Sequence, residues 1–317
     1  MANPAVRPRQ SRVIWRFSDG IPGHDNQSLG LVEALGRRLA IEVHELPAGN
    51  RRYTAWRVLV NGRYAAGTGL PDPWLLVGAG HATHLPLLIA RRARRGRAVV
   101  LMSPGLPRSL FDLCIIPDHD RPKPGANILV TRGSVNRMQR LPGEDAQCGM
   151  FLLGGPSRHY HWDDQAVVDQ LARIIRDSPV HHWVAATSRR TPAGFGRVLE
   201  QRLDSHGRQI TVTPWQDRSV EWLAGRLGQS GCAWVTEDSV SMVYEALTAG
   251  VPTGLLALPV RRSGRVVRCV RQLEASRQVT AFRDWCCGSP LLRPQERFDE
   301  ANRSAQWICD RWGKEDS

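Results

Sequence analysis

This sequence lacks long apolar runs, and that absence bears on its location. No uninterrupted apolar run approaches the roughly 18 residues that span a bilayer. The longest candidates, Trp74–Val77 and Leu85–Ala90, are interrupted by Gly, His or Pro. Met1–Gln10 carries arginines and prolines with no apolar segment behind them, so we expect no signal peptide. The sequence therefore favours a cytoplasmic protein.

The sequence also lacks the short motifs of several enzyme classes. Walker A, GxSxG, HExxH and paired CxxC motifs do not occur, which leaves P-loop, serine-hydrolase and zinc-protease functions without support. The seven cysteines are an odd number, and Cys286 and Cys287 are adjacent, which is typical of a reducing compartment. Asp118-His119-Asp120 matches the DxD metal motif. Three residues match often by chance, and Arg121 and Lys123 follow directly, so we expect no metal.

Lysine is almost absent from this strongly basic chain. Lys123 and Lys314 are its only lysines among 43 basic residues, and with 30 acidic residues the net charge is +13. Such proteins meet nucleic acid, anionic membranes or anionic substrates, although an arginine excess can also reflect a biased genome. Two clusters stand out: Arg91, Arg92, Arg94, Arg95 and Arg97, then Arg261, Arg262, Arg265, Arg268 and Arg271. Each is either a solvated helix face or an anion-binding surface.

Strand and helix patterns alternate along all 317 residues. Apolar strand candidates such as Arg12–Phe17 and Gly149–Leu153 precede helical patterns such as Asp25–Ala40 and Asp163–Arg176. This alternation predicts an α/β protein with two Rossmann-like, doubly wound domains that face each other across a cleft. A polar stretch around Pro142-Gly143 separates an N-terminal domain, residues 1–141, from a C-terminal domain, residues 148–317. The C-terminal tail, 282–312, is helical in character and could pack back on the N-terminal domain.

Ligands of such sheets bind beyond the carboxyl ends of the strands, so the loops that leave strands are the candidate sites. In the first loop, Gly20 and Gly23 allow tight turns, and His24 stands where a helix begins. A histidine there could be a general base. Alternatively, Asp19 and Asn26 are turn or cap residues and His24 only packs. The second loop, Gly78-Ala79-Gly80, starts like a dinucleotide fingerprint but lacks its third glycine.

Two further loops offer phosphate-binding residues. After the strand that ends at Leu153, Gly154 and Gly155 followed by Ser157 and Arg158 could cradle a phosphate. The next strand is followed by a similar set, with Ser188 and Arg189. In both loops, ordinary helix capping is the alternative.

The fourth loop begins a helix that carries an acidic residue. Ser239 and Ser241 stand at the predicted helix start, where hydroxyl and N–H groups could hold a diphosphate. Glu245 lies one turn further and could reach a ribose or sugar hydroxyl. The alternative is a capping motif with a solvated Glu245.

The chain resembles the mitochondrial fission ELM family in four segments, which follow the family's order between Ser18 and Pro252: SDGIPGHDNQSLGLVEALG, GGPSRHYHWD, TSRRTP and VTEDSVSMVYEALTAGVP. The plant member of that family acts in mitochondrial division, and bacterial members are described as glycosyltransferases. The resemblance implies the GT-B architecture of two Rossmann-like domains around a cleft. Where relatives often carry basic residues, this chain has Ala79-Gly80-His81.

The family in turn is similar to the lipid-linked N-acetylglucosamine transferase of peptidoglycan synthesis, and this similarity implies roles for individual residues. It makes the N-terminal domain the acceptor side and the C-terminal domain the nucleotide-sugar side. The acceptor-side Gly-His loop falls on Gly23 and His24. On the donor side, the Gly-Gly-Ser loop and the helix whose acidic residue holds the ribose fall on Gly154, Gly155, Ser157, Ser239, Ser241 and Glu245.

The leading hypothesis is a metal-independent glycosyltransferase. Its donor substrate would be a nucleotide-diphosphate sugar, and no further cofactor is expected. Arg158 or Arg189 would offset the charge on the leaving diphosphate. His24 would take a proton from the hydroxyl of a lipid-linked or cell-envelope glycan. The Arg91–Arg97 group would hold the protein on an anionic inner leaflet.

Three alternatives remain at this stage. A non-catalytic, membrane-associated adaptor of the same family would bind no nucleotide sugar. A nucleotide-sugar epimerase on the same fold would need further acid–base residues that the sequence does not identify. Nucleic acid is not expected as a partner, because no recognised motif accompanies the charge.

Overall fold

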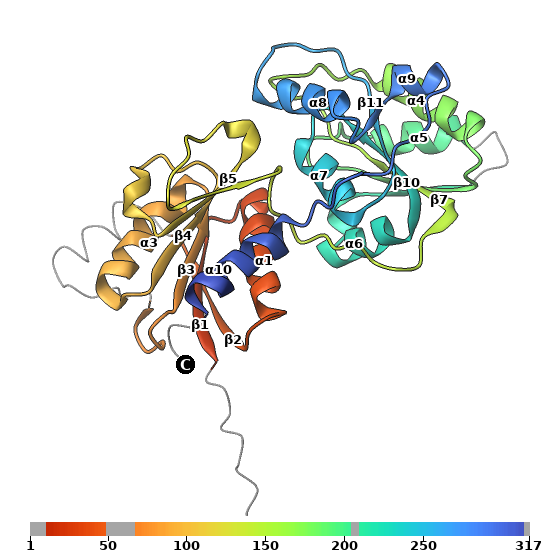
Figure 1. Ribbon diagram of the computed structural model, residues 1–317. Coiled ribbons are helices and arrows are strands. Elements are labelled where there is room, and N and C mark those ends of the chain that lie inside the picture. Colours follow the sequence, from red (N-terminus) through yellow and green to blue (C-terminus); the bar gives the residue numbers. More distant parts are fainter. Residues whose placement is uncertain (1–10, 49–66, 204–208, 314–317) are drawn as a thin grey trace, which may run out of the picture. The chain divides into compact units, whose positions relative to one another are not determined.

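The computed structural model describes residues 11–48, 67–203 and 209–313. The chain divides into two compact units (Figure 1). The first unit runs to Arg137 and takes up the chain again from Glu300, and the second unit is Met138–Asp299. The first change of unit thus precedes the polar Pro142-Gly143 stretch by a few residues. That stretch leads directly into a strand, because Asp145 already pairs with Ser230 in the second sheet.

In the first unit, the described strands form one parallel sheet in the order β2-β1-β3-β4-β5-β6. One face of this sheet packs against helices α1 and α10, and the other packs against α3. Within β1, Ile14 points to the first face and Trp15 to the second, as the period of two in a strand requires. The elements are β1 Arg12–Ser18, α1 Pro22–Gly36, β2 Ile41–Pro47, β3 Leu75–Ala79, α3 His81–Arg94, β4 Arg97–Leu101, β5 Leu113–Pro117, β6 Ile128–Thr131 and α10 Glu300–Trp312.

The second unit repeats this plan with the parallel order β12-β11-β10-β7-β8-β9. Helices α6 and α7 cover one face of its sheet, and α4 and α5 cover the other. The elements are β7 Asp145–Leu152, α4 Asp164–Asp177, β8 His182–Ala186, α5 Phe195–Leu203, β9 Gln209–Thr213, α6 Val220–Gln229, β10 Ser230–Thr236, α7 Val240–Ala249, β11 Thr253–Leu256, α8 Arg265–Ala275, β12 Thr280–Ala281 and α9 Phe282–Cys286.

Both sheets are doubly wound, which confirms the predicted fold class. The strand order reverses between β1 and β3 in the first sheet and between β7 and β10 in the second. Parallel α/β sheets bind ligands outside the carboxyl ends of the strands at such a point of reversal. The loops after these four strands are therefore where each unit can form a site.

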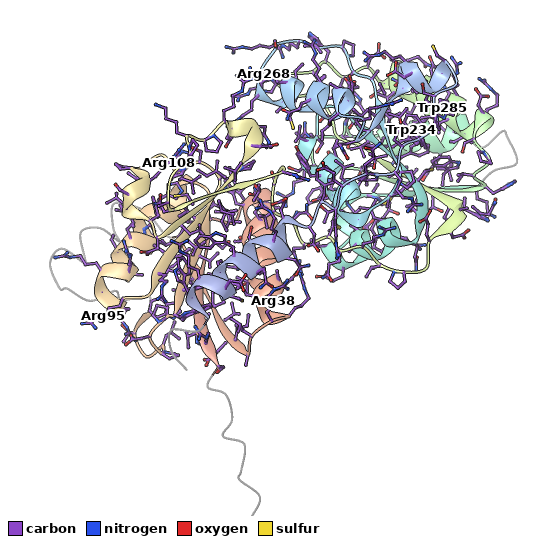
Figure 2. All side chains as sticks on the ribbon, in the orientation of Figure 1. Arg38, Arg95, Arg108, Trp234, Arg268 and Trp285 are labelled. Carbon is purple, nitrogen blue, oxygen red and sulfur yellow. The ribbon has the colours of Figure 1, made fainter. Side chains whose placement is uncertain are left out.

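The helical tail predicted over 282–312 is interrupted. The structure has a short helix, α9, then irregular chain, then α10, because Pro290 and Pro294 lie between the two helices. Helix α10 lies along α1, where Asn302 accepts hydrogen bonds from Arg37 and Arg38 at 3.2 and 3.0 Å (Figures 1 and 2). Its apolar side joins the core of the first unit.

Two elements of the second unit lie in a part of the sequence for which we predicted no structure. Helix α8 carries the second arginine cluster, and the two-residue strand β12 ends the sheet.

Two further properties concern the helices and the cysteines. In the described residues, none of the helices is long and apolar enough to cross a membrane. All seven cysteines are free thiols in this structure.

Candidate functional site

The loop after β1 brings His24 into the first turn of α1. That helix starts at Pro22, earlier than the predicted Asp25, because proline suits the first helical position. Gly20 adopts a left-handed conformation with φ of 73°, which turns the chain sharply between strand and helix. The N–H of Ile21 donates to Asp19 Oδ1 at 3.1 Å. Asp19 is thus a turn residue, as one interpretation of the sequence held.

Asp19 also has a second partner, and that partner is His24. Its Oδ2 lies 2.9 Å from Nδ1 of His24, and the two side chains are 6% and 22% exposed. A carboxylate that accepts from the Nδ1 proton fixes the orientation of the ring and leaves the Nε2 lone pair to take a proton. This Asp–His arrangement is that of a general base with its orienting group.

The loop after β3 closes against this pair. Gly80 has φ of 85°, and a Cβ at its position would overlap both His24 Nδ1 and Asp19 Oδ2. This close approach explains why the position is a glycine. The glycines of this loop therefore do not require a bound dinucleotide as their explanation. The strand exits on both sides of the first reversal point therefore meet at the histidine.

A buried arginine holds the start of α1 in place. Arg16 on β1 is 3% exposed. Its guanidinium contacts Asp25 at 2.8 Å, Ser28 at 3.0 Å and Glu45 at 2.7 Å. Ser28 Oγ in turn donates to the backbone carbonyl of His24 at 3.2 Å. These contacts fix the helical turn that carries the histidine.

In the second unit, the Gly154-Gly155 loop after β7 lies against the β10 exit. The N–H of Gly154 donates to Thr236 Oγ1 at 2.8 Å, and that of Gly155 donates to Asp238 Oδ2 at 3.2 Å. A Cβ at Gly154 would overlap the Asp238 carboxylate, and one at Gly155 would overlap the Arg190 carbonyl. Both N–H groups thus have protein partners, and in this conformation neither is available to cradle a phosphate.

Asp238 ties three strand exits together. Its side chain is fully buried and pairs with Arg190, whose Nη1 lies 2.5 Å from Oδ2. Burial raises the pKa of Asp238, although the Arg190 guanidinium acts in the opposite direction. Ser188 Oγ donates to the Gly154 carbonyl at 3.0 Å, which joins the β8 exit to the β7 exit. Ser188 is therefore part of this framework rather than an exposed ligand group.

The two predicted arginines are exposed, as Arg190 is, and differ from it in their contacts. Arg189 lies over the ring of Trp215, 5.1 Å from its centroid, in the loop after β9. Arg158 donates to the neighbouring His159 at 3.1 Å. Ser157, beside it, accepts from the N–H groups of His159 and Tyr160, so its lone pairs serve the turn while its hydroxyl proton can still be donated.

The helix after β10 presents the other predicted donor-side residues. Ser239 is the N-cap of α7 and makes no side-chain capping bond, and Ser241 is exposed in the first turn. Glu245 is 8% exposed, so the capping motif with a solvated Glu245 is wrong. Its charge acts on Arg218 of the β9 exit, whose pKa is lowered by burial and raised by Glu245.

The DxD motif has a structural explanation. Asp118 Oδ1 accepts from the N–H of His119 at 2.8 Å and of Gly133 at 3.4 Å, which holds the loop after β5. Among the described residues, no three His, Cys, Asp or Glu side chains cluster in a way that could hold a metal ion.

Comparison with known proteins identifies the family of this chain. The model of the mitochondrial fission ELM1 family matches residues 22–312. The chain belongs to the mitochondrial fission ELM1 family. Among proteins with curated descriptions, none matches this chain in sequence.

Solved structures show the fold that this family member adopts. MurG of Acinetobacter baumannii is 12% identical, with a TM-score of 0.55 over 96% of this chain and 100% of that chain. The UDP-GlcNAc 2-epimerase of Methanocaldococcus jannaschii is also 12% identical, with a TM-score of 0.55 over 95% and 99%. The epimerase of Neisseria meningitidis, bound to UDP-GlcNAc, is 10% identical, with a TM-score of 0.53 over 94% and 100%. This family member has the GT-B fold of glycosyltransferases and nucleotide-sugar epimerases.

Four residues contact the predicted site residues or their loops, but the sequence did not identify them as partners. Asp19 and Gly80 were each noticed only as part of a turn, while Asp238 and Arg190 were passed over beside Ser239 and Arg189. The signal that could have identified them was shared: each stands in a loop that follows a strand at, or next to, a reversal of strand order. That order is a property of the assembled sheet and is not written in the local sequence.

Proposed function

We propose that this protein transfers a sugar from a nucleotide-diphosphate donor to an acceptor hydroxyl without a metal ion. The observation that carries the proposal is the Asp19–His24 pair, held at 2.9 Å at the reversal point of the first sheet. The GT-B fold supports the substrate class, since solved relatives in fold include an epimerase bound to UDP-GlcNAc. The acceptor, in this proposal, is a lipid-linked or cell-envelope glycan.

The geometry of the histidine indicates where the proton goes. His24 Nε2 takes the proton of the acceptor hydroxyl while the oxygen of that hydroxyl forms a bond to the anomeric carbon of the donor. Asp19 keeps the Nδ1 proton in place and stabilises the imidazolium that results. The electron pair of the breaking C–O bond leaves on the nucleoside diphosphate.

In this proposal, residues of the second unit stabilise the negative charge of the leaving diphosphate. Arg190 is already paired with Asp238, so the exposed Arg158 and Arg189 are the cations that can offset it. The start of α7, with Ser239 and Ser241, supplies further donors to phosphate oxygens. Glu245 accepts from ribose hydroxyls, and we assign Gly154 and Gly155 to loop packing rather than to direct contact.

The acid–base pair is tested by two substitutions. His24→Ala should lower the turnover number by about 10²–10⁴ because the general base is lost. Asp19→Asn should lower it comparably, because an amide can donate to Nδ1 and so favour the wrong tautomer. Turnover is measured as release of nucleoside diphosphate from a nucleotide sugar with a membrane-glycan extract as acceptor.

Donor binding serves as the control for both variants. Each should keep the thermal stabilisation by nucleotide that the unmodified protein shows, since both residues lie in the first unit. Unchanged turnover in His24→Ala would remove the role of this residue. Formation of an epimeric nucleotide sugar without any acceptor would replace the transferase proposal by an epimerase, and binding of no nucleotide sugar would favour the adaptor.

A further inference from the structure

The two arginine clusters of the sequence differ in what surrounds them. In the first, Arg91 pairs with Asp112 at 2.7 Å and Arg94 pairs with Asp72 at 2.5 Å. Arg97 lies over an indole ring. Three of these five guanidinium groups are therefore engaged in the packing of the first unit, which weakens the case for this cluster as the docking surface.

The second cluster begins in the loop after β11, which is hydrogen-bonded to the loop after β7. The N–H groups of Arg261 and Arg262 donate to the His159 carbonyl at 2.8 and 3.2 Å, and that of His161 donates to the Pro259 carbonyl at 2.9 Å. The ring of His159 sits against Gly264, where a Cβ would overlap it. The loops after β7 and β11 thus form one shaped surface.

We call this the arginine surface: four exposed side chains from the loop after β11 and the start of α8, namely Arg261, Arg262, Arg265 and Arg268. The chain from 257 to 273 contains no acidic residue. The inner side of α8, with Val267 and Val270, is buried in the core, so the arginines are displayed outward. Figure 2 shows Arg268 on the outer side of this helix.

The nearby carboxylates are occupied. Asp163 accepts from the N–H of Ala166 and so caps α4. Asp164 accepts from Nε1 of Trp162 at 2.6 Å. On the far end of α8, Glu274 pairs with an arginine of α9. Each of these three carboxylates is thus held by a partner outside the arginine surface.

We propose that the arginine surface docks the second unit on an anionic phospholipid bilayer, with Val260 entering the interface. Val260 is 46% exposed in the loop after β11 and is followed directly by Arg261 and Arg262. An exposed apolar side chain beside cations fits a headgroup layer that is anionic at its surface and apolar beneath. Single-stranded nucleic acid would need exposed stacking platforms, and Trp162, the indole of these loops, is half-buried and hydrogen-bonded. The inference goes beyond the proposed function and does not depend on it.

Vesicle co-sedimentation tests the docking surface with the full chain. Phosphatidylcholine vesicles with about 30% phosphatidylglycerol should bind the protein at low salt and release it at about 1 M salt, where the Debye length falls to about 3 Å. Each arginine near such a surface contributes about fivefold to partitioning, so Arg261→Gln/Arg268→Gln should bind about 25-fold more weakly. Val260→Asp should weaken binding further.

A matched variant separates this surface from overall charge. Arg92→Gln/Arg95→Gln removes the same charge from exposed positions of the first cluster and should keep binding within about threefold. Equal losses in both variants would overturn the proposal, as would absence of binding to anionic vesicles or a preference for DNA over vesicles. Unchanged melting temperature and nucleotide binding in the variants keep this outcome distinct from failure of the proposed function.

Discussion

Glu237, directly after β10, is a half-buried carboxyl group whose charge works against the folded state. Burial is the largest cause that raises its pKa, from 4.5 to about 7, and Glu274 raises it further. The N–H of Leu258, which donates to Oε2 at 3.2 Å, and the nearby Arg271 and Arg283 lower it, but burial outweighs them. Between these two pH values the unfolded chain releases a proton that the folded chain retains. The contribution of Glu237 to stability is therefore lost as pH rises through this window.

Replacing this carboxyl group by an amide should remove that part of the pH dependence. Glu237→Gln should match the unmodified protein below about pH 4, where the carboxyl group is largely neutral in both the folded and the unfolded chain. It should be more stable at pH 8 by up to about 3 kcal/mol, the equivalent of the shift in pKa. Urea unfolding of both proteins from pH 5 to pH 8 measures the difference, and a constant difference across this range would contradict the assignment.

At the same scale, His24 shows what could be inferred from sequence and what could not. A histidine after two glycines at a strand exit has the chemistry of a base, and the structure supplies the carboxylate 2.9 Å away. From the sequence Asp19 was only a turn or cap residue, whereas in the structure one of its carboxylate oxygens serves the turn and the other contacts His24. Burial of Glu245 was equally hidden, since it depends on the packing of α7 against the core.

Among the elements, the turns after strands owe their shape to glycines that serve different purposes. Gly155 lies against the backbone of Arg190, with no room for a Cβ. Gly23, in the first turn of α1, has nothing within 4 Å of the position a Cβ would take. From the sequence, Gly155 was expected to cradle a phosphate and Gly23 to allow a tight turn in the acceptor-side loop, and only the structure shows how differently the two glycines are packed.

A pair of glycine-to-alanine substitutions tests this difference. Gly155→Ala should destabilise the protein by about 1–3 kcal/mol or more, because the β7 and β8 exits must move apart. Gly23→Ala should leave stability unchanged or raise it by up to about 1 kcal/mol, since alanine is the better helix former. Urea unfolding compares the two, and equal stability of both variants would contradict the packing argument.

The alternation of elements was predictable because each strand and helix carries its own periodicity. Helix α7, Val240–Ala249, starts where a helix start was predicted, directly after Ser239, and Gly250 ends it. Helix α8 was given no bounds, because a solvated helix face was only one of two interpretations of its arginines, although Val267, Val270 and Leu273 have helical spacing. The break between α9 and α10 was missed because the tail was treated as one pattern.

In the molecule as a whole, a helix from the end of the chain completes the first unit. Ala301, Ala305 and Ile308 of α10 are buried in the same core as Leu31 and Leu35 of α1. The pattern of an amphipathic helix does not indicate which sheet the helix will cover. The packing of α10 on the first unit could therefore be predicted from the sequence only as one possibility. The GT-B fold follows from the two sheets together and was predicted from their repeated pattern.

The central claim for the whole molecule is that a GT-B protein of this family binds a nucleotide-diphosphate sugar in its second unit. The most direct test is the melting temperature with UDP, GDP, dTDP, CDP and their sugars. A ligand at about one hundred times its dissociation constant adds about 2.7 kcal/mol, which corresponds to a rise of about 5 °C or more. We predict such a rise with one nucleotide class, lost in Glu245→Ala and kept in His24→Ala. No rise with any of them would contradict the claim.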